Sequence, residues 1–320
     1  MSLAPYVAAL ARGPGRSRHL TMAEAERAMR LILSGEAEPE AVGALLMLMR
    51  YRGEDATEVA GLTAGLRAAL PAWPGPAPTL DWPSYAAGRS RGVPWFLLAA
   101  RLVAMAGGTV LIHGWNSHQG ARADVRAALP HAGIREARTP EDAAATMARD
   151  GIVYLPAEAA LPRLVDLLQL RTVLGLRSPL NTAARALNPG GARASVQGVF
   201  HPPYRALAAE AAALLGLPRL SVLKGGGGEF ERHPGKPAQL DGRRHGAPFS
   251  VEMPPMMEAH RRLAEDHHGP DALAALWSGA LSDPFAEAVV LGTAALALNA
   301  AGIDADPAAL WARRTAQEAA

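Results

Sequence analysis

The sequence contains no cysteine in its 320 residues, which excludes disulfide bonds and metal sites built from thiolates. Lysine is almost absent, since Lys224 and Lys236 are the only two, and arginine therefore supplies nearly all of the positive charge. No uninterrupted apolar run is long enough to span a membrane. The N-terminus has only a short apolar stretch and no cleavage site typical of a signal peptide. We therefore expect a cytoplasmic protein that does not bind a membrane.

Small apolar residues and arginine are what the chain has in quantity. Apolar residues make up 49% and charged residues 19% of the sequence, which is ordinary for a globular protein. The length allows one large or two medium domains with a sizeable core. The formal net charge is only +2. A function that depends on positive charge would therefore require the arginines to gather on one face of the molecule.

Residues 1–70 have the pattern of a helical domain. Thr21 and Asp55 are each followed three residues later by a glutamate, which is the spacing of a capping box at the start of a helix. The Pro-rich segment 71–80 predicts a linker. The remaining residues, 81–320, are expected to form the larger domain.

Strand and helix patterns alternate after the linker. Strands are expected over 79–82, 109–113 and 151–155, with a helix over 95–106. This alternation is typical of a parallel sheet flanked by helices, so the predicted fold class is α/β. Further along, residues 232–250 have the composition of a basic surface loop, and residues 255–268 are expected to form a helix.

Arginines recur through residues 170–202 beside turn-forming Gly and Pro. Arginine presents several donors in a fixed geometry that suits phosphate and carboxylate groups. The segment therefore indicates either an anion site or a connection between domains whose arginines are solvated. The polar side chains concerned are Arg171, Arg177, Arg185, Arg193, Asn181 and Asn188.

The order of the motifs in this segment resembles glycosyltransferase family 3, whose best-known members are the anthranilate phosphoribosyltransferases. The pattern is R-x-x-L-G-x-R-[ST]-x-x-N, then N-P, then V-x-G-V-[FY]-x-P. It is carried here by Arg171, Leu174-Gly175, Arg177, Asn181, Asn188-Pro189 and Gly198-Val199. A weaker match near the N-terminus includes Gly35, Pro39, Arg50, Gly53 and Glu54.

The resemblance implies a fold and an assembly. A small N-terminal helical domain, joined by parts of 160–190, would accompany a larger α/β domain with a mainly parallel central sheet. It also implies a homodimer through the N-terminal helices, with which the apolar run at 41–49 is compatible.

The catalytic motifs of that family are altered in this sequence. Where the family has the pyrophosphate-binding loop G-T-G-G-D, this chain has DWPSYAAGRSRG, whose side chains hinder close backbone approach to phosphate. The family's K-H-G-N-R becomes Ile112-His113-Gly114-Trp115-Asn116. The family's H-P-A-M segment near the acceptor has no counterpart with a histidine.

A magnesium-binding Asp-Glu pair is part of the family's pattern and is also altered. Here Phe230 replaces the first acid, and Glu231 is the one candidate ligand for Mg²⁺ that remains in the motif. Glycines 225–228 after Lys224 indicate either a phosphate-binding turn or a flexible one. If the family's site is retained, the resemblance assigns substrate and anion binding to His113, Asn116, Arg171, Arg177, Asn181 and Lys224, of which Arg171 corresponds to the arginine near anthranilate.

Two functions follow from these observations. The first is nonspecific nucleic-acid binding, single- or double-stranded, as in the YbiB-type branch of the family, which lacks the catalytic motifs. Its expected phosphate contacts are Arg89, Arg91, Arg171, Arg177, Arg185, Arg193, Arg243 and Arg244. The alternative is a phosphoribosyltransferase that uses phosphoribosyl pyrophosphate, with Mg²⁺, to transfer ribose phosphate to a nitrogen nucleophile. No residue is assigned as catalytic with either function.

Overall fold

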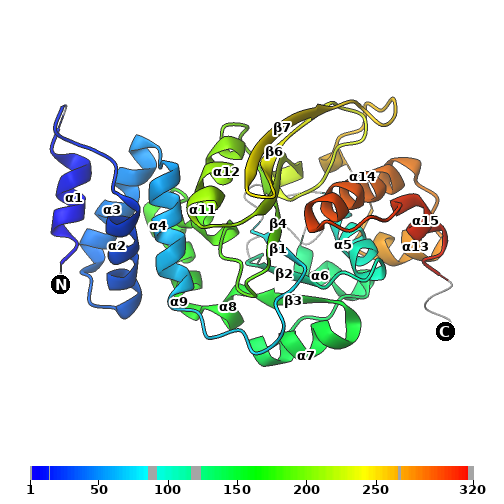
Figure 1. The fold of residues 1–320 in the computed structure, drawn as a ribbon, viewed down its shortest axis with the longest axis horizontal. Helices are drawn as coiled ribbons and strands as arrows, with labels where there is room; N and C mark the ends of the chain where they lie inside the picture. Colours follow the sequence, from blue (N-terminus) through cyan, green and yellow to red (C-terminus); the bar gives the residue numbers. More distant parts are fainter. Residues whose placement is uncertain (1, 14, 86–91, 117–123, 266–267, 316–320) are drawn as a thin grey trace.

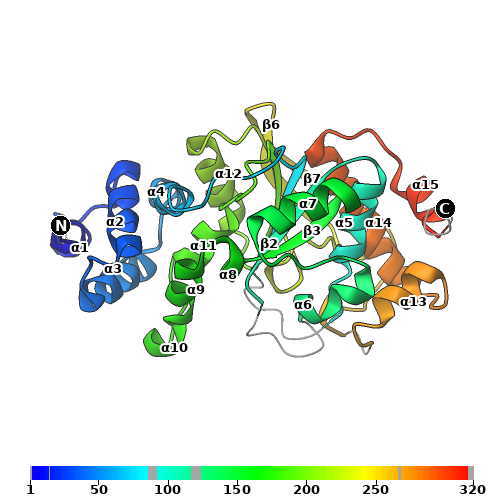
Figure 2. The ribbon, with the colours of Figure 1, turned by 90° about the horizontal axis from the view of Figure 1, so that it is seen from below.

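The computed structural model describes residues 2–13, 15–85, 92–116, 124–265 and 268–315. A group of N-terminal helices lies at one end of the molecule, and a sheet covered by helices forms the rest (Figure 1). The view from below shows the same division and places the two termini at opposite ends (Figure 2). The α/β class with a helical N-terminal part is therefore confirmed.

The N-terminal helices begin at the residues that the sequence indicates. Thr21 and Asp55 each accept a hydrogen bond from the backbone of the glutamate three residues later, and each glutamate bonds back, so both capping boxes are confirmed. Each box satisfies backbone donors that the first helical turn leaves unpaired. The four helices are α1 (Ala4–Ala11), α2 (Met22–Ser34), α3 (Pro39–Arg52) and α4 (Ala56–Arg67).

Helices α2 and α4 pack at close range through two glycines of α4. A Cβ atom on Gly61 would lie 2.3 Å from the carbonyl oxygen of Met22, and one on Gly65 would lie 2.5 Å from Cβ of Met29. The absence of these side chains lets the two helix backbones approach each other. Helices α2 and α4 are therefore closely packed against each other.

The sheet has the strand order β3-β2-β1-β4-β5-β6-β7. Neighbouring strands are parallel from β3 through β5, and the last two are antiparallel to their neighbours. The sheet is thus mainly parallel, as the sequence predicts. The strands are β1 (Leu80–Ser84), β2 (Val110–Gly114), β3 (Ile152–Pro156), β4 (Ala194–Val199), β5 (Arg219–Lys224), β6 (Ala238–Arg244) and β7 (Ala247–Met253).

Helices cover both faces of the sheet. Ile112 and Tyr154 belong to the core beneath one set of helices, whereas their neighbours Leu111 and Val153 belong to the core on the other face, as strand geometry requires. The first face is covered by α5 (Phe96–Met105), α13 (Ala272–Ser278), α14 (Pro284–Ala301) and α15 (Pro307–Ala312). The second is covered by α7 (Pro140–Asp150) and α12 (Tyr204–Leu214).

Helix α14 is long and apolar enough to cross a membrane by length and composition. It packs against α5, β4 and β5, and 61% of its apolar window is buried inside the protein. Its hydrophobic character is therefore explained by its place in the core.

One apolar cluster joins the N-terminal helices to two later ones, α9 (Pro162–Gln169) and α11 (Leu180–Arg185). Leu45, Leu46 and Met49 of the apolar run lie in this cluster and are buried within the chain. These three side chains are thus unavailable to a partner subunit. The homodimer stays a prediction of the resemblance.

Arg67 at the end of α4 forms hydrogen bonds across the same junction. Its Nε donates to the carbonyl of Leu187 at 3.0 Å, and its Nη2 donates to that of Ala186 at 2.8 Å. One side chain of the helical part thereby satisfies two carbonyls of the segment that follows α11.

Two sequence predictions are wrong. Residues 232–250, expected as a loop, contain β6 and much of β7, which form a hairpin at the edge of the sheet. Residues 255–268, expected as a helix, hold only the short 3-10 turn Leu263–Glu265 among their described residues. The backbone N–H groups of Met256 and Met257 instead donate to the carbonyl of Pro234, which ties the start of that segment to the chain before β6.

The capping box at Thr21 leads to a prediction about acid stability. A hydrogen-bonded ion pair with Arg18, at 2.7 Å, lowers the pKa of Glu24 from 4.5 to about 2. The stabilisation is therefore complete above pH 4.5 and is lost as the pH falls towards 2. We expect Glu24→Gln to reduce the free energy of unfolding by about 1 kcal/mol or less at pH 6, because solvent screens a surface pair.

Urea unfolding at pH 6 and pH 3 measures this difference. At pH 3 the difference in the free energy of unfolding between Glu24→Gln and the unmutated protein should be smaller. Glu210→Gln, at an exposed position on α12, is the matched control and should show no comparable gap. A gap for Glu24→Gln that is the same at both pH values would contradict the prediction.

Candidate functional site

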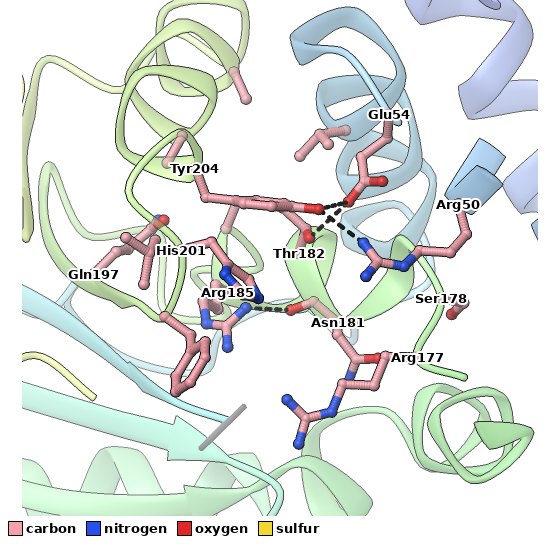
Figure 3. Close-up of a pocket in the computed structure, with 16 residues that line it drawn as sticks. Arg50, Glu54, Arg177, Ser178, Asn181, Thr182, Arg185, Gln197, His201 and Tyr204 are labelled. Atoms are coloured by element: carbon pink, nitrogen blue, oxygen red, sulfur yellow. Dashed lines mark hydrogen bonds between the residues drawn. The ribbon is translucent and has the colours of Figure 1, made fainter. Parts of the chain in front are cut away.

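A pocket of about 230 Å³ lies between the helical part and the sheet part of the chain. Its walls come from the end of α3, the start of α4, α11, the end of β4 and the start of α12 (Figure 3). Its polar lining residues are Arg50, Glu54, Arg177, Ser178, Asn181, Thr182, Arg185, Gln197, His201 and Tyr204.

Positive charge concentrates at this pocket. Burial, and then the nearby charges of Arg171, Arg185 and Arg50, lower the pKa of Arg177 from 12.5 to about 10. Like charges held so close destabilise one another unless an anion compensates them. The convergence therefore indicates an anion site.

The local fold explains why these arginines meet. Gly175 adopts a left-handed conformation (φ 70°) and ends the short helix α10 (Arg171–Leu174), which glycine allows without steric cost. The chain then turns into α11, where Asn181 and Arg185 are four residues apart and share a face. The guanidinium of Arg185 donates through Nη1 to the carbonyl of Asn181 at 3.1 Å.

Arg185 is 8% exposed, and burial lowers its pKa. Its Nη2 has no hydrogen-bond partner within the described part of the chain. A buried donor without a partner costs free energy. This atom is therefore suited to a ligand in the pocket.

A carboxylate lies on the wall formed by the helical part. Glu54 is 6% exposed, and its Oε1 accepts hydrogen bonds from Tyr204 and Thr182, each at 3.1 Å. Arg50 donates to the Tyr204 hydroxyl at 3.0 Å. Burial, followed by the charge of Glu54, raises the pKa of Tyr204. Sequence reasoning noted Arg50 and Glu54 as family-like positions but placed neither in a site, and it missed Tyr204.

His113 and Asn116, at the carboxyl end of β2, are both fully buried. His113 contacts Asp81 through Nε2 at 3.1 Å and Tyr85 through Nδ1 at 3.1 Å. Asn116 donates to Ser84 at 3.3 Å and accepts from Tyr154. Both expected substrate-binding residues therefore take part in hydrogen bonds inside the protein.

The two acids after the glycine run are also buried. Glu231 is fully buried, and its Oε1 accepts the backbone N–H of Phe96 at 3.0 Å, at the first residue of α5. Glu229 accepts from the hydroxyl of Ser84 at 3.1 Å. The positive end of a helix attracts anions, and here the protein's own carboxylate occupies one of its donors. Lys224 lies exposed at the end of β5.

Only part of the expected nucleic-acid set comes together. Arg177 and Arg185 line the pocket, and Arg171 lies near enough to Arg177 for its charge to lower the pKa of that residue. Arg193 lies apart from it, among residues around Pro218. The other expected positions are Arg89 and Arg91, which lie outside the described residues, and Arg243 and Arg244 on β6, which bond to Gly246 and Asn299.

His19, Asp55 and Glu58 form a cluster that could hold a cation by distance alone. Glu58 accepts from the backbone of Leu20 at 2.9 Å and of Asp55 at 3.2 Å, and it bonds His19 at 2.9 Å. These bonds belong to the start of α4. The cluster is therefore explained by helix capping.

Comparisons with known proteins bear on the whole chain. Residues 4–70 match the family model described as "Glycosyl transferase family, helical bundle domain". The anthranilate phosphoribosyltransferase of Methylobacterium nodulans is 30% identical over 315 residues, which cover 95% of this chain and 90% of that protein. The chain belongs to glycosyltransferase family 3. The family relationship spans both the helical part and the sheet part.

Further members of glycosyltransferase family 3 are similar to this chain. The anthranilate phosphoribosyltransferase of Methylocella silvestris is 29% identical over 95% of this chain and 87% of its own length. The crystal structure of the Thermus thermophilus enzyme matches 99% of both chains with a TM-score of 0.79 and 24% identity. The Saccharomyces cerevisiae enzyme in complex with PRPP and Mg matches 98% of this chain and 92% of that chain, with a TM-score of 0.76 and 16% identity. These structures confirm the expected fold of the family.

Proposed function

We propose that this member of glycosyltransferase family 3 binds nucleic acid through phosphate groups at the arginine-lined pocket. The convergence of Arg177, Arg185 and Arg50 at one cavity supports this proposal most directly, and the charge of Arg171 also acts on Arg177. Arginine contacts to phosphate give affinity without sequence preference and make binding strongly salt-dependent. The contact surface would centre on the pocket, since the arginines of β6 lie elsewhere.

The amino end of α5 supports a binding function over a transfer function. A pyrophosphate group there would meet the buried carboxylate of Glu231, which already accepts the N–H of Phe96. Like charges at short range in a desolvated site are costly. The family has a glutamate at the same motif position and pairs it with an aspartate to hold Mg²⁺; Phe230 replaces that aspartate here, and the donor chemistry is therefore disfavoured.

The second candidate is phosphoribosyl transfer to a nitrogen nucleophile. The comparisons support it better than nucleic-acid binding, because the relatives named above are anthranilate phosphoribosyltransferases and the yeast enzyme is seen with PRPP and Mg. The residues present do not fit that metal well. Glu231 is fully buried with Oε1 bonded to Phe96, and Phe230 is apolar. A Mg²⁺ requirement stays conditional on transfer activity.

A salt series with labelled DNA tests the first proposal. Single-stranded and duplex DNA of mixed sequence should bind, with log affinity falling linearly in log salt. Arg177→Glu should weaken binding by about tenfold or more at low salt and flatten the salt slope by about 1 or more, because it removes a phosphate contact and adds repulsion. Arg30→Glu, at an exposed position on α2, is the matched control and should have little effect.

The same preparations, incubated with phosphoribosyl pyrophosphate, Mg²⁺ and anthranilate, test the second candidate. Pyrophosphate release that depends on the acceptor would establish transfer. No DNA binding at low salt would overturn the first proposal. If the Arg177 and Arg30 variants weakened DNA binding equally, the pocket would not be the DNA-binding site.

A further inference from the structure

Two buried groups of opposite charge face the pocket without partners. They are Nη2 of Arg185 and Oε2 of Glu54, and neither has a hydrogen-bond partner among the described residues. Their side chains are 8% and 6% exposed. A buried charge is retained only when it is paired and hydrogen bonded. The two groups are not bonded to each other, so a ligand that satisfies both would relieve both costs.

The other lining residues indicate the shape of the ligand between its two polar ends. The Tyr204 ring and the side chains of His201 and Arg185 line the cavity (Figure 3). The remaining walls combine six apolar side chains with the polar residues Arg50, Ser178, Asn181, Thr182 and Gln197. These lining residues suit a flat ring, and the apolar ones are Val59, Ala186, Val199, Phe200, Ala208 and Ala211.

The charges fix how such a ligand would lie. Arg185 and the nearby Arg177 require an anionic group. Oε1 of Glu54 already accepts two hydrogen bonds, whereas Oε2 can accept from an N–H group. A carboxylate attracts an amino group and repels a carbonyl oxygen. The complementary molecule is therefore a ring with an amino group at one end and an anionic group at the other, which the proposed binding of nucleic acid identifies as a phosphate.

We propose that the pocket receives a single nucleotide whose base carries an exocyclic amino group, with that group donating to Glu54 and the phosphate on Arg177 and Arg185. This inference rests on the proposed nucleic-acid binding and adds a preference for base type. The nucleotide is either free or part of a single strand whose base enters the pocket. Cytosine, adenine and guanine carry such an amino group, whereas uracil and thymine carry only carbonyl oxygens on the ring.

Titration calorimetry with CMP and UMP, and fluorescence titration with oligo-dC and oligo-dT, tests the inference. The original chain should bind CMP about tenfold more tightly than UMP, as expected for a hydrogen bond to a charged group. Glu54→Gln keeps an oxygen for Tyr204 and Thr182 but turns an amide N–H₂ to the pocket. This variant should lose the preference for CMP or reverse it. A preference for CMP over UMP would identify the ligand as a free nucleotide. A preference seen only for oligo-dC over oligo-dT would identify it as part of a single strand.

Arg185→Gln provides an independent variant if Glu54→Gln unfolds. It should weaken CMP and UMP equally, because it removes the phosphate contact and leaves Glu54 in place. The inference would be overturned if the unmutated protein bound CMP and UMP equally and also bound oligo-dC and oligo-dT equally. Nonspecific DNA binding would then remain the proposed function. Anthranilate binding with no nucleotide binding would also overturn it. Absence of any DNA binding in the salt series would count against the proposed function alone if CMP is still preferred.

Discussion

Glu231→Gln is expected to raise the affinity for inorganic pyrophosphate by about tenfold or more, because it removes a buried negative charge from the amino end of a helix. Glutamine keeps an oxygen to accept the N–H of Phe96, so the local structure should persist. If Glu231 instead served as a ligand for Mg²⁺, the same change would weaken the binding of pyrophosphate with the metal. The sign of the effect thus separates the two candidate functions.

Calorimetry with pyrophosphate, with and without Mg²⁺, measures this effect. Glu252→Gln, on the exposed strand β7, changes the net charge equally and is the control for long-range attraction. If the control and the Glu231 variant gain affinity equally, the carboxylate does not block the site. Reduced affinity in the presence of Mg²⁺ would support the transferase.

Gly225→Ala is expected to destabilise the protein by about 3 kcal/mol or more, as overpacking against backbone does. A Cβ atom at this position would lie 1.6 Å from the carbonyl oxygen of Glu229. Gly198 of β4 is similarly tight, since its Cβ would lie 2.0 Å from the carbonyl carbon of Glu229. The two glycines admit the backbone that brings Glu229 to Ser84.

Denaturant unfolding of Gly225→Ala and Gly198→Ala measures this cost. Gly43→Ala in helix α3 is the matched control, because its Cβ would meet only Leu174 at an ordinary 3.8 Å. There we expect stabilisation of about 0.4–1 kcal/mol, from lower entropy of the unfolded chain. Similar values for the control and the two tight positions would show that the backbone around Glu229 yields easily.

Local signals predicted the parts of the fold that local signals control. Thr21 and Asp55 begin helices because their side chains bond to residues only three positions away. The hairpin β6-β7 was missed because the basic and turn-forming residues before it suggested a surface loop, although Phe249, Val251 and Met253 alternate with polar residues along β7. Its turn is formed by His245 and Gly246, both with positive φ, and this pair was the available signal. The motif order over residues 170–202 correctly indicated the family.

The site was predicted on one wall only. Arg171, Arg177 and Arg185 lie within one segment, so their recurrence is visible in the sequence. Glu54 is bonded to Thr182 and Tyr204, which lie 128 and 150 positions further along the chain. No pattern in a single sequence joins residues at that separation. His113 and Glu231 were taken from motif positions, and their burial depends on packing that the motif does not encode.

The hydrogen bonds from Arg67 to the carbonyls of Ala186 and Leu187 have a thermodynamic consequence. The pocket exists only while the helical part is docked on the sheet part, since each supplies one wall. Any ligand that touches both walls therefore adds its binding free energy to the docking and raises the unfolding midpoint with ligand concentration. By the same linkage, a substitution of Arg67 that removes these hydrogen bonds would lower ligand affinity without altering any residue of the pocket.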